Sequence, residues 1–260
     1  MKVDMMKYWR SSIVLAIVVL ALLVSPTMTF AHNANPGVFP INSRPFGLTY
    51  GQWSARWWQF AFQQENLEFC KTDKPGSKVV FLAGTPGPPA VTRPCTVHTG
   101  QAIMFPVFNV SWSRVEANIQ GNKTPGQTCL VPTQPNGTDY AALRACATAQ
   151  ANNATQSGAK LEAEVDGKTL QNLTNYRAVS PPPPFTFTAV KGNPFGVCEL
   201  VNNCSSGSLT SRAVADGFWI MLKPLSPGKH TIHFAATVPF PNVDQPFTYT
   251  ADTTYHVTVC

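Results

Sequence analysis

Two acidic side chains are the best candidates for general acid and base chemistry in this chain. Asp216 directly precedes an apolar run typical of a buried strand, and Glu116 is the second candidate. Glycoside hydrolysis needs two carboxylates that face one sugar at a separation of about 5 to 9.5 Å. Both residues also have a structural explanation, because Asp216 and Gly217 form a common turn pair and Glu116 suits a solvated surface. We favour the structural explanation for both.

The histidines give little support for a metal site. His230 and His233 lie three residues apart on a predicted strand, so their side chains point to opposite faces and do not chelate one ion. His230 can instead meet His256 across neighbouring strands, although a site needs at least three converging ligands. A copper brace is the remaining alternative, because removal of residues 1–31 would make His32 the first residue. No cofactor is predicted.

Exposed aromatic side chains are a further route to binding, because they stack on the faces of sugar rings. Trp112 is the best candidate, since it lies between two serines at the end of a predicted strand. Trp219 lies inside the run Phe-Trp-Ile-Met-Leu and is expected in the core. The sequence has no G-x-S-x-G elbow, P-loop or dinucleotide fingerprint, so α/β-hydrolases and nucleotide-dependent enzymes are not expected.

The N-terminus has the pattern of a secretory signal peptide. Lys2, Lys7 and Arg10 precede the apolar run 13–24, and the small residues around Ala31 suit signal peptidase. We therefore predict a signal peptide at 1–31 and a secreted, periplasmic or cell-surface protein. An uncleaved anchor is the alternative, and this segment is the only expected membrane contact. The Lys and Arg residues form no run, so no nucleic-acid partner is expected.

All seven cysteines follow the predicted signal peptide, which favours disulfide bonds. No two have the C-x-x-C spacing of a zinc or redox motif. Proximity along the chain suggests three pairs, although spacing alone does not prove the connectivity. These pairs are Cys70–Cys95, Cys129–Cys146 and Cys198–Cys204. Cys260 is left as a free thiol through which two copies can dimerise.

A tryptophan-rich helix is the clearest predicted element. Residues 49–64 begin with Thr49, and Gln52 three positions later completes a capping box. Three Trp and two Phe cover most of its circumference, so the helix is expected to be buried on more than one side. Its polar residues fall on one narrow ridge, which consists of Gln52, Arg56, Gln59 and Gln63.

The rest of the chain indicates an all-β fold. About nine or ten short apolar segments separated by turns predict a jelly-roll-like β-sandwich, to which the Trp-rich helix and an Ala-rich helix at 139–152 are added. Asp166-Gly167 is the strongest hairpin turn, and Pro106 inside a strand indicates an edge or a bulge. We expect an extended N-terminal arm at 32–47 and a single domain at 48–260.

Three sequence blocks resemble a family of uncharacterised secreted proteins from bacteria and archaea. They are Tyr50-Gly-Gln-Trp-Ser-Ala-Arg-Trp-Trp-Gln59, Phe81-Leu-Ala-Gly84 and the longer block from Asp216 to Phe234. The resemblance implies an exported β-sandwich and implies no activity. The chain departs from the family near Trp112, where a Glu-Cys pair is expected.

Two functional hypotheses follow. The first is a secreted or cell-surface binding or structural module whose ligand is a glycan or another surface polymer. The second is an exported enzyme that acts on polysaccharides, either a glycosidase that uses carboxylates or a copper monooxygenase built on His32. Fold-level analogy alone suggests the ligand in both cases.

Overall fold

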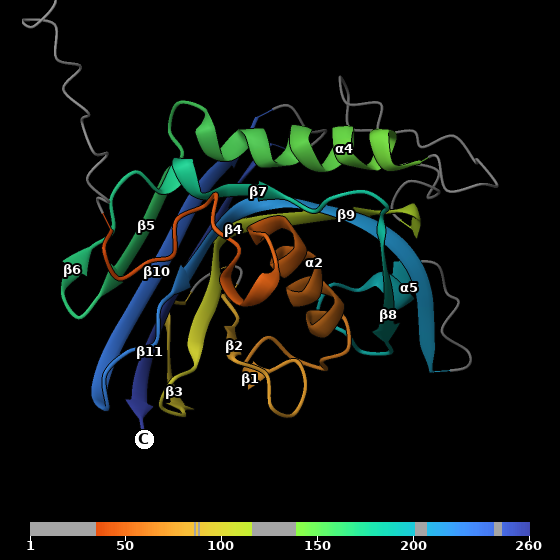
Figure 1. The fold of residues 1–260 in the computed structure, drawn as a ribbon. Helices are drawn as coiled ribbons and strands as arrows, with labels where there is room; N and C mark the ends of the chain where they lie inside the picture. The colour runs from red at the N-terminus through yellow and green to blue at the C-terminus, as the bar shows by residue number, and fades with distance from the viewer. Residues whose placement is uncertain (1–34, 86, 88, 116–138, 201–206, 242–245) are drawn as a thin grey trace, which may run out of the picture. The chain divides into compact units, whose positions relative to one another are not determined.

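Two packed β-sheets form the body of the protein (Figure 1). The computed structural model describes residues 35–85, 87, 89–115, 139–200, 207–241 and 246–260. Residues 34–260 belong to one compact unit. The predicted all-β sandwich with two added helices is confirmed. The predicted sites Glu116, Cys129, Cys204 and His32 lie outside the described residues.

The first sheet contains six strands, in the order β1-β2-β4-β9-β7, and β8 also pairs with β9. Its pairs are antiparallel except for β2 with β4, which run parallel. Strands far apart in the sequence therefore lie side by side, as the jelly-roll-like prediction requires. The strands are β1 (Cys70–Thr72), β2 (Val79–Leu82), β4 (Ala102–Ser113), β7 (Arg177–Val179), β8 (Phe185–Val190) and β9 (Ser208–Leu222).

The second sheet contains five strands in the order β3-β11-β10-β5-β6. Alternation along its long strands places one set of side chains in the core, where Phe234 stacks on Phe105 of the first sheet at 4.6 Å. Asp166 and Gly167 form the predicted β5–β6 turn, and both have positive φ. The strands are β3 (Val91–Val97), β5 (Lys160–Val165), β6 (Lys168–Thr169), β10 (Gly228–Phe240) and β11 (Phe247–Val259).

The predicted Trp-rich helix is α2 (Tyr50–Ala61), and its capping box is present. Trp57 is 3% exposed, lies 5.5 Å from the Trp219 ring and donates its indole N–H to the Leu82 carbonyl at 3.0 Å. The helix therefore covers one face of the first sheet near β9 (Figure 1). Its role as part of the core is confirmed.

The Ala-rich helix is α4 (Tyr140–Asn152), which lies across β4 and β9 on the side opposite α2 (Figure 1). Leu143 and Ala147 are fully buried against Val214. Small side chains on α4 let the helix approach the sheet closely, so a second apolar cluster forms beneath it.

Several short elements differ from the sequence prediction. β9 begins at Ser208, although the apolar run after Asp216 predicts a strand only from residue 217. The additional short elements are β1, α5 (Val197–Leu200) and the 3-10 helices η1 (Pro45–Gly47), η2 (Asn153–Thr155) and η3 (Leu173–Tyr176). The arm packs on the domain, because Val38 forms a β-bridge with Leu222. A register shift follows Pro106, which confirms the expected bulge.

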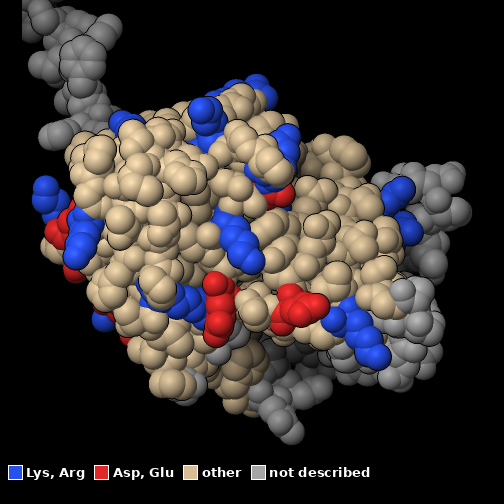
Figure 2. All heavy atoms as spheres, turned by 90° about the horizontal axis from the view of Figure 1, so that it is seen from below, with Lys and Arg blue, Asp and Glu red and all other residues tan. Residues whose placement is uncertain are grey.

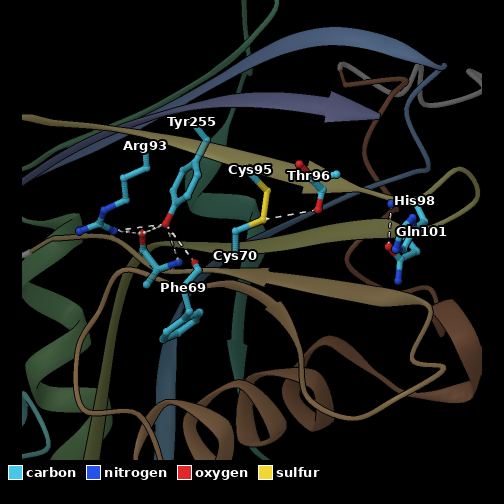
Figure 3. The surroundings of a disulfide bond; sticks show 9 residues. Phe69, Cys70, Arg93, Cys95, Thr96, His98, Gln101 and Tyr255 are labelled. Carbon is cyan, nitrogen blue, oxygen red and sulfur yellow. Dashed lines mark hydrogen bonds between the residues drawn. A yellow bond between two sulfur atoms is a disulfide. The ribbon is translucent and has the colours of Figure 1, made fainter. Parts of the chain in front are cut away.

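The predicted disulfide Cys70–Cys95 joins β1 of the first sheet to β3 of the second, beside the Arg93 and Tyr255 side chains (Figure 3). Cys146 and Cys198 are also disulfide-bonded, while Cys260 is free and exposed. Disulfides persist in oxidising compartments, so the chain folds outside the reducing cytosol. No helix among the described residues is both long and apolar enough to span a membrane.

Candidate functional site

A polar groove runs beside the exposed ridge of α2, and we call it the α2 groove. It has a volume of about 280 Å³. The half-buried Phe60 ring forms part of its wall, and this ring packs edge-on against Phe69 at 5.1 Å. The lining residues are Arg56, Gln59, Phe60, Gln63, Asp73, Thr186, Phe187 and Thr188.

Internal contacts hold one end of the α2 groove in place. The Arg56 guanidinium forms an ion pair with Asp73 and lies 4.8 Å from the centre of the Trp53 ring. Gln59 donates its amide N–H to the Thr186 carbonyl at 2.8 Å, which ties α2 to β8. The helix ridge and the strand edge therefore form one fixed wall.

Other polar groups in the α2 groove remain available. The exposed Gln63 side chain and the exposed Thr186 hydroxyl make no hydrogen bond with the described residues. Gln59 still has a free amide oxygen, because its nitrogen makes the bond to β8. The groove thus combines the apolar Phe60 ring, free hydrogen-bond donors and acceptors, and the ion pair between Arg56 and Asp73.

The surface has no strong field of one sign on the face shown in Figure 2. Lys and Arg side chains are scattered over it, together with fewer Asp and Glu, among a majority of uncharged residues.

A second hollow, the β4-edge cleft, lies along β4 between α2 and the second sheet and has a volume of about 320 Å³. Most of its lining residues are apolar, and none of them carries a charge. They are Trp57, Trp58, Phe62, Leu67, Gly84, Pro106, Val107, Asn109, Val110, Ser111, Phe195, Phe234, Tyr249 and Ala251. Burial raises the pKa of Tyr249 to about 12, so its phenol is neutral at ordinary pH.

Asp216 does not precede a strand, as the sequence suggested, but lies inside β9 and is fully buried. Arg177 donates to both carboxylate oxygens at 2.9 and 2.8 Å, and the Thr148 hydroxyl donates to one of them at 2.9 Å. This carboxylate therefore connects β9 to β7 and α4. Its candidate partner Glu116 lies outside the described residues.

Trp112 lies one residue before the end of β4, as the sequence suggested, but its side chain is less exposed than expected. It is half-buried and packs against the cluster under α4, next to Val214. Its indole nitrogen is buried and has no partner within the described residues. Packing against this cluster covers part of the Trp112 side chain and leaves the rest in contact with solvent.

The expected approach of His230 to His256 is wrong. The β10–β11 register places Val257 opposite His230, so His256 points to the other face of the sheet. Both ring nitrogens of His230 are already engaged, by Asp166 at 2.7 Å and the Ser226 carbonyl at 2.8 Å. Within the described residues, no three His, Cys, Asp or Glu side chains converge to hold a metal.

The His230–Asp166 pair predicts a pH-dependent contribution to stability. The hydrogen bond to Asp166 raises the pKa of His230 above 6.5. Partial burial alone would raise the pKa of Asp166, but hydrogen bonds from His230 and the Thr231 amide lower it below 3.8. The histidine contribution is lost as pH rises through its raised pKa, and the aspartate contribution is lost as pH falls through its lowered pKa.

The pair should therefore stabilise the fold most between pH values of about 4 and 6.5. We expect the difference in urea midpoint between the parent protein and His230→Gln to be largest in this window and to shrink on both sides. A difference that stays constant from pH 4 to pH 9 would contradict this assignment. His233→Gln is the matched control, because His233 pairs with the exposed Asp252 on the outer face.

Comparisons with protein-family models, curated proteins and solved structures found no match. The site must therefore be judged on geometry. The sequence predicted the polar ridge of α2 as a feature of the helix and not as a site, and it did not indicate Asp73, Thr186 and Thr188, which complete the α2 groove. Asp73, Thr186 and Thr188 lie far from α2 in the sequence, so nothing in the sequence indicates that they meet the helix. The sequence shows only that the polar residues of the ridge lie on one side of α2.

Proposed function

We propose that this protein is an exported β-sandwich module that binds a glycan or another hydroxyl-rich surface polymer in the α2 groove. The observation that carries this proposal is the combination of the half-exposed Phe60 ring with the free amide of Gln63 and the free hydroxyl of Thr186. A sugar ring has an apolar C–H face and hydroxyl groups that both donate and accept. The groove offers a partner for each.

The position of the groove also suits a long ligand. It is open to solvent beside α2, and its wall is fixed by the Gln59 contact to β8. A polymer can pass through an open channel, whereas an enclosed pocket accepts only a chain end. The ring is already packed on Phe69, so little side-chain entropy is lost when a sugar binds.

Retention on a panel of insoluble polysaccharides tests this function. We expect the protein to be retained by at least one of cellulose, chitin, xylan and peptidoglycan. Gln63→Ala should weaken the affinity about three- to tenfold, the usual effect of losing one or two hydrogen bonds. Since the Gln63 side chain makes no hydrogen bond within the described fold, the variant should keep the parent melting temperature.

Gln156→Ala is the matched control. Gln156 is exposed in the turn after α4 and lines neither the α2 groove nor the β4-edge cleft. Equal losses for Gln63→Ala and Gln156→Ala would place the binding surface elsewhere. Absence of retention on the whole panel would end the glycan proposal.

A further inference from the structure

We propose that the β4-edge cleft is a docking site for an extended, uncharged peptide segment that pairs with the free edge of β4 as an added strand. This site is separate from the α2 groove. Its lining residues come mainly from three parts of the fold, which are α2, β4 and the second sheet. The inference rests on the backbone of β4, on the side chains of the walls and on two buried donors.

Among the described residues, the backbone edge of β4 that faces β2 is only partly paired. β2 is short, and it covers β4 only between Ala102 and Met104. Beyond this point the described strands pair with β4 only on its other side, through β9. Alternate N–H and C=O groups of the uncovered part therefore point away from the sheet, where they can pair with another chain.

The cleft follows this uncovered edge. Its lining includes Pro106, Asn109 and Val110. Asn109 and Val110 are neighbours on β4, so their side chains point to opposite faces of the sheet. A hollow that touches both faces of a strand lies at the edge of that strand. The regular part of this edge beyond the bulge, from Phe108 to Ser113, spans roughly 17 Å at 3.3–3.4 Å per residue, which is long enough for about five residues of a partner strand.

The walls suit the side chains of an added strand. One wall is formed by Trp57, Trp58 and Phe62 near α2, and the other by Tyr249 and neighbouring residues of the second sheet. Side chains of an extended peptide alternate between two directions, so one set would face each wall. No charged residue lines the cleft, and a charged side chain there would lose its hydration without gaining a partner.

Two buried donors in the lining lack acceptors. Trp58 is 5% exposed, and its indole nitrogen has no hydrogen-bond partner within the described residues. The same holds for the side-chain amide nitrogen of Asn109 on β4. Buried polar groups without partners are costly, and peptide carbonyls are acceptors that can satisfy them after a small adjustment of the lining.

The experiment uses the blocked peptide acetyl-Gly-Val-Thr-Val-Thr-Val-Gly-amide as a probe, with the whole protein in calorimetry and NMR titrations. We expect saturable binding with shifts of the β4 amides and of the Asn109 side-chain NH2 signals. Two N-methylated peptides are compared, one methylated on the odd-numbered residues and the other on the even-numbered residues. Only one of these sets of N–H groups points toward β4, so one of the two peptides should bind at least about tenfold more weakly, because it loses two or three inter-strand hydrogen bonds.

A pair of tryptophan variants provides the matched control. Trp58→Phe keeps an aromatic ring and removes the donor, so it should weaken peptide binding about three- to tenfold. Trp112→Phe removes another unpartnered indole N–H from β4, but under α4, and should leave binding unchanged.

Three outcomes would overturn the proposal. They are no binding of the probe at millimolar concentration, equal binding of both methylated peptides, and equal effects of the two tryptophan variants. Self-association that the probe does not displace, with shifts of the β4 amides on dilution, would show a second copy of the chain at this edge and would also overturn it.

Discussion

The Gly51→Ala variant is expected to lose at least about 3 kcal/mol of unfolding free energy, at the upper end of the cost of overpacking. A Cβ atom at Gly51 would lie 2.1 Å from the carbonyl oxygen of Val179 in β7. That neighbour is backbone, so the helix or the strand must move. At an exposed helix position the same substitution would stabilise by roughly 0.5–1 kcal/mol, so the expected sign is reversed.

Gly37→Ala is the matched control for this prediction. Gly37 is exposed, and a Cβ atom there would meet nothing within 4 Å. Urea unfolding should show a lower midpoint for Gly51→Ala alone. If Gly51→Ala is as stable as Gly37→Ala, then α2 does not approach β7 as closely as the structure indicates.

The Arg177→Met variant is expected to lose about 3–5 kcal/mol, the usual cost of removing one partner of a buried ion pair. Arg177 supplies two hydrogen bonds to the fully buried Asp216, and its removal leaves Thr148 as the one described residue whose side chain bonds this carboxylate. Arg177 also donates to Asn152 at 2.8 Å, so the anchor of α4 is weakened as well. Urea unfolding measures the loss.

A double variant separates charge from packing. Arg177→Met with Asp216→Asn removes the unpaired carboxylate and should recover part of the lost stability. A double variant that is less stable than Arg177→Met would contradict the ion-pair explanation. The same comparison tests the role of Asp216, because a residue that serves only to connect β9, β7 and α4 affects folding and leaves glycan retention unchanged.

Most regular elements of the fold could be predicted because their signals are local. The capping box of Thr49 and Gln52 defines the start of α2, and Asp166-Gly167 defines the β5–β6 turn. β9 was predicted too short because Ala213 and Ala215 are small, so its first half lacks the apolar run that marks a buried strand.

The environments of individual side chains were harder to predict because they depend on distant segments. Asp216 finds its main partner Arg177 39 positions away, and nothing near either residue indicates the pair. Trp112 was expected to be exposed because serines flank it, but the end of β4 packs beneath α4. The free edge of β4 depends on the short length of β2, which the apolar run at 78–83 does not reveal.

The most direct test of the glycan-binding proposal is an NMR titration with soluble oligosaccharides from whichever polysaccharide retains the protein. The proposal predicts saturable shifts of the Gln59 and Gln63 side-chain amide signals and of the β8 amides around Thr186, with no shift of the Trp112 indole signal. Shifts confined to other surfaces, or no shifts at millimolar oligosaccharide, would contradict binding in the α2 groove.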